Sequence, residues 1–392
     1  MPTPLEQLSP SLAHPIHDAF SAPSADQQDA NIVHRACIRD LVGMQKEGVV
    51  TNTRRELAWR LSSDEGDYLD GADIAPPPLG NMAAGMVAAY FDSLLGVADA
   101  WDATVEDAEI TLDNFYTMQG SALRGDMSGG ALPPELTVTV AVEGADGEEL
   151  VETAVDRSPV TALIREPLDN LFTLVEGGER VATDRVPEYE GQVLPDPEAS
   201  FQETTRPATR HEPDPVTHTG AKTEEPPAEH ERYTEGESSS LEAEQDRVLH
   251  VRGEGSLRDD GLYHVLQKIY SPRASMFEFL ADRDPALGGE GRAPDAMSYV
   301  AAGIGFCFMT QFGRYAEIKR KELGGYRIVQ DLPWSGAPGE SGRVDPLITH
   351  VYLDTPEGKA FAKELLDFSE QTCFLHALCG GSNDPKVTVE TR

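Results

Sequence analysis

The sequence predicts an α+β protein made of two copies of one unit, each an antiparallel sheet packed on two helices with one long central helix. Three observations predict this class. The triplet AAG recurs at 83–85 and 301–303, so the copies are related by a shift of 218 residues. Strand-like alternation follows each long apolar segment, and a polar stretch separates the copies. Because order, spacing and composition agree through most of each copy, chance similarity is a poor explanation.

Each copy contains the same elements in the same order. Early strands or a hairpin and a turn lead into a long apolar segment, 83–99 in the first copy and 301–317 in the second, whose pattern indicates a buried helix. After another strand and a variable loop, LTVTVAV at 136–142 and LITHVYL at 347–353 alternate as strands do. A second helix closes each copy, and the two segments are 148–164 and 358–378.

Composition divides the chain into four parts. Residues 1–30 have no motif and are predicted to be a disordered tail, and 31–183 and 247–392 are the two copies. Residues 184–246 are rich in Pro, Glu, Ser and Thr and have almost no apolar periodicity, so we expect a disordered acidic linker. A random coil of about 60 residues reaches roughly 40 Å, which is enough for the two copies to meet.

The net charge of −36 limits the partners of the protein. Such a surface repels phosphate backbones and anionic lipids, so we expect no binding to nucleic acid or membrane surfaces. An acidic, lysine-poor composition is also typical of a protein from a high-salt cytoplasm, where salt screens the repulsion. The alternative is a protein from ordinary salt whose charge is concentrated in the linker.

The expected location is the cytoplasm. No basic N-terminal segment precedes an apolar run, so the sequence predicts no secretory signal. No stretch reaches about 18 uninterrupted apolar residues, so no membrane span is expected. The four cysteines are too few for a disulfide framework and are predicted to be mostly reduced.

The two copies differ in their thiols. Cys307 lies in the long apolar segment of the second copy, where the first copy has Ala89. Cys373 lies in the second helix of the same copy, and Ser158 stands roughly at its place in the first copy. Paired presence and paired absence indicate that the two sulfurs work together. The alternative for each is a cysteine that serves as a small hydrophobic residue.

The second copy resembles a known family. The segment FLADRDPALGGEGRAPDAMSYVAAGIGFCFMTQFGRYAE, followed by a strand and by CFLHAL, is similar to the OsmC/Ohr family of thiol-dependent peroxidases, which reduce organic hydroperoxides. The resemblance covers about 250–390 well and about 35–170 as a degenerate copy. It implies an intertwined pair of units, which one chain can form as an intramolecular pseudo-dimer. Pairing between two chains is the alternative.

The resemblance also implies the chemistry. Cys307 would attack the peroxide as a thiolate, and Cys373 would resolve the resulting sulfenic acid as a disulfide. A dithiol or lipoyl protein would then reduce the disulfide by exchange. No cofactor is expected. The rival interpretation is a non-catalytic module that binds an apolar small molecule or carries sulfur.

Members of this family lower the pKa of the reactive thiol with an Arg that a Glu orients. We expect this Arg at Arg273, and Arg55 holds the equivalent place in the first copy. The family's Pro-Glu would put the acid ten positions before the cysteine, where this chain has Met297. Asp295, directly after Pro294, is the expected substitute. This departure from the family pattern favours the non-catalytic alternative.

The remaining constellations carry less weight. Cys373, His376 and Cys379 recur every three residues and could bind a soft metal with Cys307, but this spacing is common by chance, and no metal is expected. The glycine-rich LGGEGRAP lacks the strand and helix that a nucleotide-binding loop needs. We expect Cys37, His264 and His350 to be structural or surface residues.

Overall fold

The computed structural model describes residues 4–17, 20, 22–23, 32–54, 57–205, 207–228, 230 and 242–392. The expectation for Arg55 and the part of the predicted linker at 231–241 lie outside these residues.

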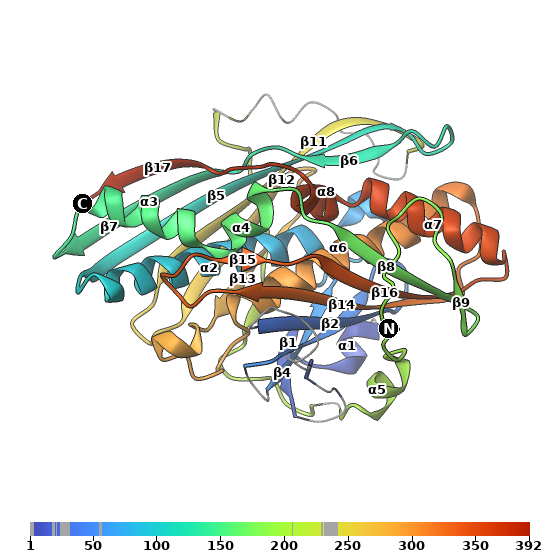
Figure 1. Cartoon of the computed structure of the whole chain (residues 1–392), viewed down its shortest axis with the longest axis horizontal. Coiled ribbons are helices and arrows are strands. Elements are labelled where there is room, and N and C mark those ends of the chain that lie inside the picture. The colour runs from blue at the N-terminus through green and yellow to red at the C-terminus, as the bar shows by residue number, and fades with distance from the viewer. Residues whose placement is uncertain are drawn as a thin grey trace.

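Two sheets and eight helices make up the described part of the chain (Figure 1). The first sheet has the strand order β1 (Ala13–Ile16), β4 (Ala58–Ser63), β3 (Lys46–Asn52), β2 (Ile32–Asp40), β14 (Gly325–Ser335), β16 (Leu347–Asp354), β8 (Asn170–Glu176) and β9 (Glu179–Val181), with β15 (Arg343–Val344) paired to β14. The second sheet has the order β10 (Val216–Lys222), β13 (Ser275–Ala281), β12 (Tyr263–Ser271), β11 (Glu244–Leu257), β5 (Thr104–Ser121), β7 (Glu135–Glu143) and β17 (Lys386–Thr391), with β6 (Ser128–Ala131) paired to β5. The helices are α1 (Pro4–Leu8), α2 (Pro78–Ala100), α3 (Gly147–Arg157), α4 (Pro159–Arg165), α5 (Glu198–Glu203), α6 (Ala296–Lys319), α7 (Lys359–Thr372) and α8 (Phe374–Gly380).

The α+β class with two long central helices is confirmed, and the structure adds that neither sheet belongs to one copy. Strands β2, β3 and β4 of the first copy continue into β14 and β16 of the second, and β11, β12 and β13 of the second continue into β5 and β7 of the first. The strand that follows the last helix of each copy also crosses over, because β8 pairs in parallel with β16 and β17 in parallel with β7. The two copies are therefore interleaved around an internal pseudo-twofold axis.

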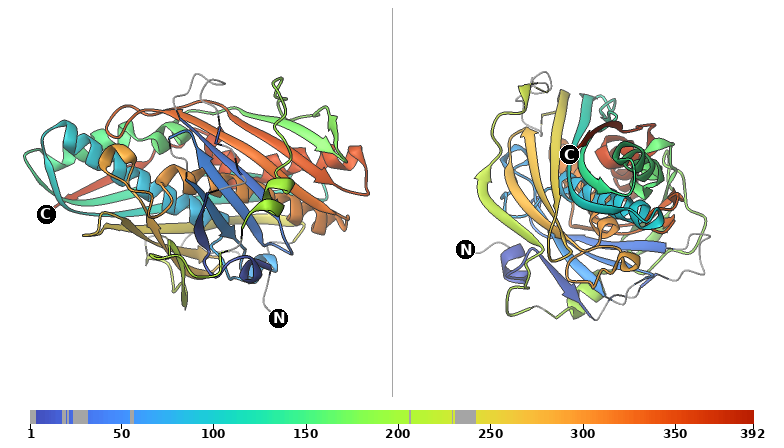
Figure 2. Two further views of the ribbon diagram at one scale, coloured as in Figure 1. Left: turned by 90° about the horizontal axis from the view of Figure 1, so that it is seen from below. Right: turned by 90° about the vertical axis from the view of Figure 1, so that its left-hand side faces the viewer.

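The long helices α2 and α6 pack against each other in the core that both sheets cover (Figures 1 and 2). The contact is symmetric, because the shift of 218 residues relates Gly85 to Gly303 and Met82 to Val300. A Cβ at Gly85 would lie 2.7 Å from the backbone N of Val300, and one at Gly303 would lie 2.8 Å from the backbone N of Met82. Only glycine permits so close an approach of two helix backbones. Helix α2 is long and apolar enough to cross a membrane, but 89% of its most apolar window is buried inside the protein, as in a core helix.

Two parts predicted to be disordered contain regular structure, so those predictions were wrong for the described residues. In the tail, α1 is followed by β1, which pairs antiparallel with β4. In the predicted linker, α5 is followed by β10, which pairs with β13 in the same way. Each copy therefore begins with an edge strand, and the second copy begins near β10 rather than at residue 247.

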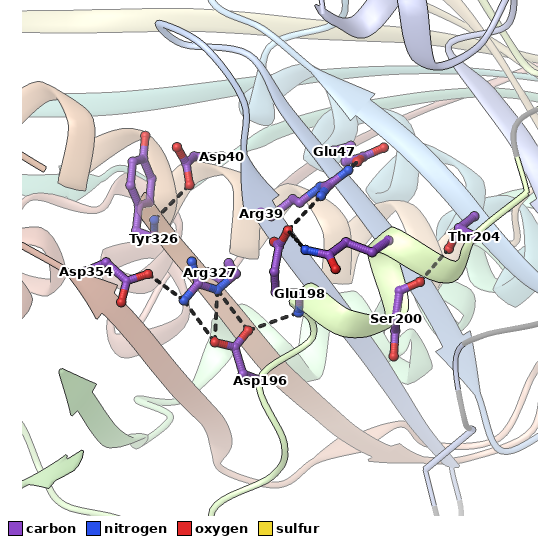
Figure 3. A network of polar contacts seen from close by, with 11 residues as sticks. Arg39, Asp40, Glu47, Asp196, Glu198, Ser200, Thr204, Tyr326, Arg327 and Asp354 are labelled. Carbon is purple, nitrogen blue, oxygen red and sulfur yellow. Dashed lines mark hydrogen bonds and ion pairs between the residues drawn. The ribbon is translucent and has the colours of Figure 1, made fainter. Parts of the chain in front are cut away.

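Ion pairs hold the acidic segment around α5 on the first sheet (Figure 3). Arg327 on β14 donates from Nε to Asp196 Oδ1 at 2.8 Å, and Arg39 on β2 donates to Glu198 Oε1 at 3.2 Å. Arg327 also pairs with Asp354 on β16. A pattern of apolar residues cannot reveal this segment, because arginines far away in the sequence fix its position.

Candidate active site

The two predicted thiols lie on elements that pack against each other. Cys307 lies in the middle of α6 and is 2% exposed, and Cys373 is fully buried at the junction of α7 and α8, both of which contact α6. The backbone N–H of His376 donates to Cys373 Sγ at 3.4 Å. Burial and, after it, the neighbouring Cys307 thiol raise the pKa of Cys373 well above its usual value. The Cys373 thiol therefore keeps its proton at neutral pH.

The equivalent junction in the first copy lies between α3 and α4. Ser158 ends α3 and begins α4, as Cys373 ends α7 and begins α8. The topology thus agrees with the repeat that Ser158 in the first copy corresponds to Cys373 in the second, and Ala89 to Cys307.

A pocket with an empty volume of about 390 Å³ opens beside Cys307. Its apolar wall comes from both copies and consists of Leu69, Pro78, Leu79, Met118, Leu249 and Phe374. Its polar side is formed by Glu65, Tyr68, Arg247, Thr310, Gln311 and Arg314. Because Cys307, Thr310 and Arg314 are spaced by three and four residues on α6, they share one face of that helix.

Glu65 is the acidic group of this pocket, and it comes from the first copy. The loop that contains it follows β4, and its carboxylate accepts from Tyr68 Oη at 2.7 Å and from the Thr310 hydroxyl at 2.9 Å. Burial raises the pKa of Glu65, while Lys46, the two hydrogen bonds and Arg247 oppose this shift.

Three basic groups surround the thiols and this carboxylate. Burial lowers the pKa of Arg247, on β11, to about 10 and that of Arg314, on α6, to about 9. Lys46 on β3 is fully buried, and its Nζ donates to Met44 O at 2.7 Å. Burial lowers the pKa of Lys46, while attraction to Glu65, Asp64 and Cys307 opposes the shift. Arg247 and Arg314 thus outnumber Glu65 among the charged side chains that line the pocket beside Cys307.

The expectation that Arg273 and Asp295 stand beside Cys307 is wrong. Arg273 is 48% exposed between β12 and β13 and pairs with Glu225. Asp295 caps the N-terminus of α6, where its carboxylate accepts from the backbone N of Ser298 at 2.8 Å. It lies twelve residues before Cys307, or about 18 Å along the helix. It therefore cannot act on the thiol.

Sequence reasoning missed Glu65 because it sought the acid just before Cys307 in the same copy, and it missed Arg247 because it placed the arginine at Arg273. The pseudo-twofold axis instead places the loop before α2 next to the middle of α6. The available signal was the acid-rich stretch SSDEGDYLDG at 62–71, which precedes the first long helix.

The other two cysteines have different surroundings. Cys379 on α8 is fully buried, and burial, followed by repulsion from Cys307, raises its pKa to about 12. Cys37 on β2 belongs to a separate apolar cluster on the first sheet, and burial raises its pKa to about 12 as well. Cys379 is therefore within electrostatic reach of the thiol pair, and Cys37 packs in a different cluster.

Cys307, Cys373, His376 and Cys379, which were considered as ligands of a soft metal, are not a cluster with metal-ligand spacing among the described residues. His376 packs its ring on Phe308 at 4.6 Å between centroids. In the described part of the chain, metal-ligand spacing occurs at Asp113, His230 and His250, whose donor atoms lie within 4.8 Å of one another. The guanidinium of Arg252 already binds both oxygens of Asp113, at 2.7 and 2.8 Å, and so neutralises that carboxylate.

Comparison with known proteins finds a likeness in one part of the chain. The family model of the OsmC-like proteins matches residues 289–390, which include Cys307 and Cys373. The crystal structure of an OsmC-like hydroperoxide resistance protein from Jannaschia sp. CCS1 is similar at 17% identity and a TM-score of 0.22, covering 34% of this chain and 87% of that chain. None of the curated proteins matches the chain. Glu65 and Arg247 lie outside the matched OsmC-like segment.

Proposed function

We propose that the protein is a thiol peroxidase that reduces organic hydroperoxides. The Cys307 thiolate attacks the terminal oxygen of the hydroperoxide, the O–O bond breaks, and an alcohol leaves after it takes up a proton. The Cys373 thiol then displaces water from the Cys307 sulfenic acid and forms a disulfide. A dithiol or lipoyl protein returns both sulfurs to thiols and is itself oxidised to a disulfide.

The observation that carries this proposal is the position of Cys307 in the wall of a pocket that is both apolar and basic, with the Cys373 thiol as its neighbour. Positive charge favours the thiolate over the thiol, which is the nucleophilic form. The apolar wall suits the carbon chain of an organic hydroperoxide better than it suits hydrogen peroxide. Cys373 lies at the junction of α7 and α8, which both contact α6, so the disulfide would join elements that already pack together.

Glu65 and Arg247 take the roles for which the sequence offered Asp295 and Arg273. The carboxylate is fixed by Tyr68 and Thr310, and it attracts Arg247. A fixed carboxylate restricts the positions of a neighbouring guanidinium, as in other Arg–carboxylate pairs. We assign Glu65 as the positioning residue and Arg247 as the group that stabilises the thiolate. Because Glu65 belongs to the first copy, one complete site requires both copies.

The test is a stoichiometric reaction of the reduced full-length protein with cumene hydroperoxide, followed by mass mapping of disulfides. The expected product is a Cys307–Cys373 bond, which Cys307→Ser abolishes and Cys379→Ser leaves intact. In Cys373→Ser, Cys307 is expected to accumulate as a sulfenic acid that dimedone traps. Cys37→Ser is the matched control, since it removes a buried thiol that packs in a different cluster. If Cys307 and Cys373 stay reduced under peroxide, the proposal is refuted.

The alternative, a non-catalytic binding function, is supported by a second pocket. This pocket lies at the equivalent position in the first copy and contains no cysteine.

A further inference from the structure

The second pocket, called here the thiol-free pocket, occupies the pseudo-symmetric position of the thiol pocket. Ala296 and Met297 at the start of α6 line it, as Pro78 and Leu79 at the start of α2 line the thiol pocket. Ala89 takes the place of Cys307. The lining further includes Asp92 and Ser93, which the shift of 218 residues aligns with Thr310 and Gln311. The pocket is therefore the counterpart of the thiol site in the first copy.

The thiol-free pocket is the larger of the two. Its empty volume is about 550 Å³, against about 390 Å³ beside Cys307. Pockets for small molecules usually measure about 300–1,000 Å³ and combine an apolar wall with a few polar groups. The apolar wall here consists of Ala89, Pro159, Pro285, Met297, Trp334 and Pro338. Loss of the thiols has thus not closed the cavity.

The two pockets carry opposite charge. Arg247 and Arg314 outnumber Glu65 in the thiol pocket. In the thiol-free pocket the acidic side chains Asp92, Asp284, Asp295 and Glu340 face a single guanidinium, Arg54, and one imidazole, His34. A pocket with this excess of carboxyl groups attracts cations and repels anions.

Two of the carboxylates already have partners inside the protein. Arg54 forms an ion pair with Asp284 and lies over the ring of Trp334. Trp334 Nε1 donates to His34 Nδ1 at 3.0 Å, so His34 Nε2 carries the proton that Asp295 accepts, also at 3.0 Å. These contacts fix the wall of the pocket and engage Asp284 and Asp295.

Asp92 keeps acceptor capacity for a ligand. Its Oδ1 accepts from Tyr263 Oη at 2.7 Å and from the backbone N of Asp284 at 3.0 Å. Among the described residues, no donor reaches its Oδ2, and the side chain lines the pocket. A carboxylate oxygen that is held in place from one side and open on the other is suited to bind an ammonium group.

We propose that the thiol-free pocket binds a small organic cation, an apolar body that carries one protonated amine, with the ammonium group on Asp92 and the body against Trp334 and Met297. This function goes beyond the peroxidase activity and uses none of its residues. The first copy would then be a ligand-binding partner of the second rather than only a support for its fold.

Charge linkage agrees with this ligand. Burial, followed by repulsion from Asp284 and Asp295, raises the pKa of Asp92 to about 8. The charged or titratable groups in the pocket or in contact with its wall are Tyr263, Asp284, Asp295, Glu340, His34, Arg54 and Arg283, which lies over the Tyr263 ring. A bound ammonium group stabilises the ionised carboxylate, so the cation binds more tightly as pH rises toward 8.

The test compares three probes of one shape by titration calorimetry on the full-length protein: 3-phenylpropylamine, 3-phenylpropanol and 3-phenylpropionate. At pH 8, about the pKa of Asp92, we expect the amine to bind roughly tenfold or more tightly than the alcohol, as for a hydrogen bond between charged groups, and the carboxylate not to bind. The Asp92→Asn variant is expected to bind the amine no better than the alcohol. Cys307→Ser is expected to bind the amine as the unmodified protein does, which separates this site from the peroxidase.

A measurement on the unmodified protein guards against misfolding of the variant. Amine affinity should rise severalfold between pH 6.5 and 8, while alcohol affinity should stay constant. Equal binding of the three probes, an amine affinity that does not change with pH, or full retention of amine binding by a folded Asp92→Asn would each overturn the proposal. Failure of the peroxide reaction would leave this proposal untouched, because no probe here is an oxidant.

Discussion

The close contact between the central helices gives the sharpest prediction about stability. Replacing Gly303 with Ala would place a Cβ at 2.8 Å from Met82 N, at 3.1 Å from the Met82 Cα and at 3.1 Å from Pro78 O. These are backbone atoms of a buried helix, so they cannot rotate away. An ordinary carbon contact begins near 3.4 Å, so α2 and α6 must separate by about half an ångström.

The magnitude follows from two opposing effects. Overpacking a dense core costs about 1–3 kcal/mol. Replacing Gly by Ala inside a helix raises the unfolding free energy by about 1 kcal/mol. The expected net effect of Gly303→Ala is a loss of up to about 2 kcal/mol of unfolding free energy, and Gly85→Ala should behave alike because its Cβ would meet Val300 and Ala296 at 2.7 Å.

Gly313→Ala is the matched control on the same helix. The atoms nearest to its Cβ would be the Tyr326 hydroxyl, at 3.0 Å, and the Met44 sulfur and Tyr326 Cζ, both at 3.9 Å. These are the ends of side chains, which can shift, so this variant keeps most of the helix gain. Urea unfolding followed by circular dichroism should rank Gly313→Ala above the unmodified protein or equal to it, and Gly303→Ala below it. A Gly303→Ala protein that is as stable as Gly313→Ala would refute the argument from close helix contact.

Three further changes test the thiol site and the buried carboxyl group. Glu65→Gln keeps the shape of the side chain but removes the charge that positions Arg247. The rate of Cys307 oxidation, measured by stopped flow, should therefore fall roughly tenfold. Glu340→Gln, in the thiol-free pocket, is the control and should leave this rate unchanged. Cys373→Ser should leave the first oxidation step intact but allow excess peroxide to oxidise Cys307 to the sulfinic acid, which intact-mass analysis detects. A sulfenic acid that stays stable under excess peroxide would contradict the resolving role of Cys373. The pKa of Asp92, about 8, lies above its ordinary 3.8. The folded state therefore holds a proton that the unfolded state has lost between these values. The unfolding free energy should therefore fall on the order of a few kcal/mol as pH rises across that window. Urea unfolding at pH 5 and 8.5 measures this fall in the unmodified protein, and the fall should be absent in Asp92→Asn.

Much of the fold could be predicted because it depends on local pattern. The repeat fixes two long apolar helices, and the alternation at 136–142 and 347–353 corresponds to β7 and β16. The presence of Cys307 and Cys373 in one copy alone marked the two thiols, and the structure places them on elements that pack together. The helices and strands are visible because each depends on a local pattern, and the thiols are visible because the two copies can be compared residue by residue.

The sequence by itself determined the class of the fold, the repeat and the two sulfurs. Only the tertiary structure decided which copy completes the site, since the exchange of strands around the pseudo-twofold axis brings Glu65 to Thr310 in the pocket beside Cys307. It likewise ordered β10 and α5, where strand pairing and ion pairs to distant arginines replace the apolar core that the segment lacks. Contacts between residues more than 200 positions apart, such as Thr310 with Glu65, depend on how the two copies pack, and no local pattern encodes that packing.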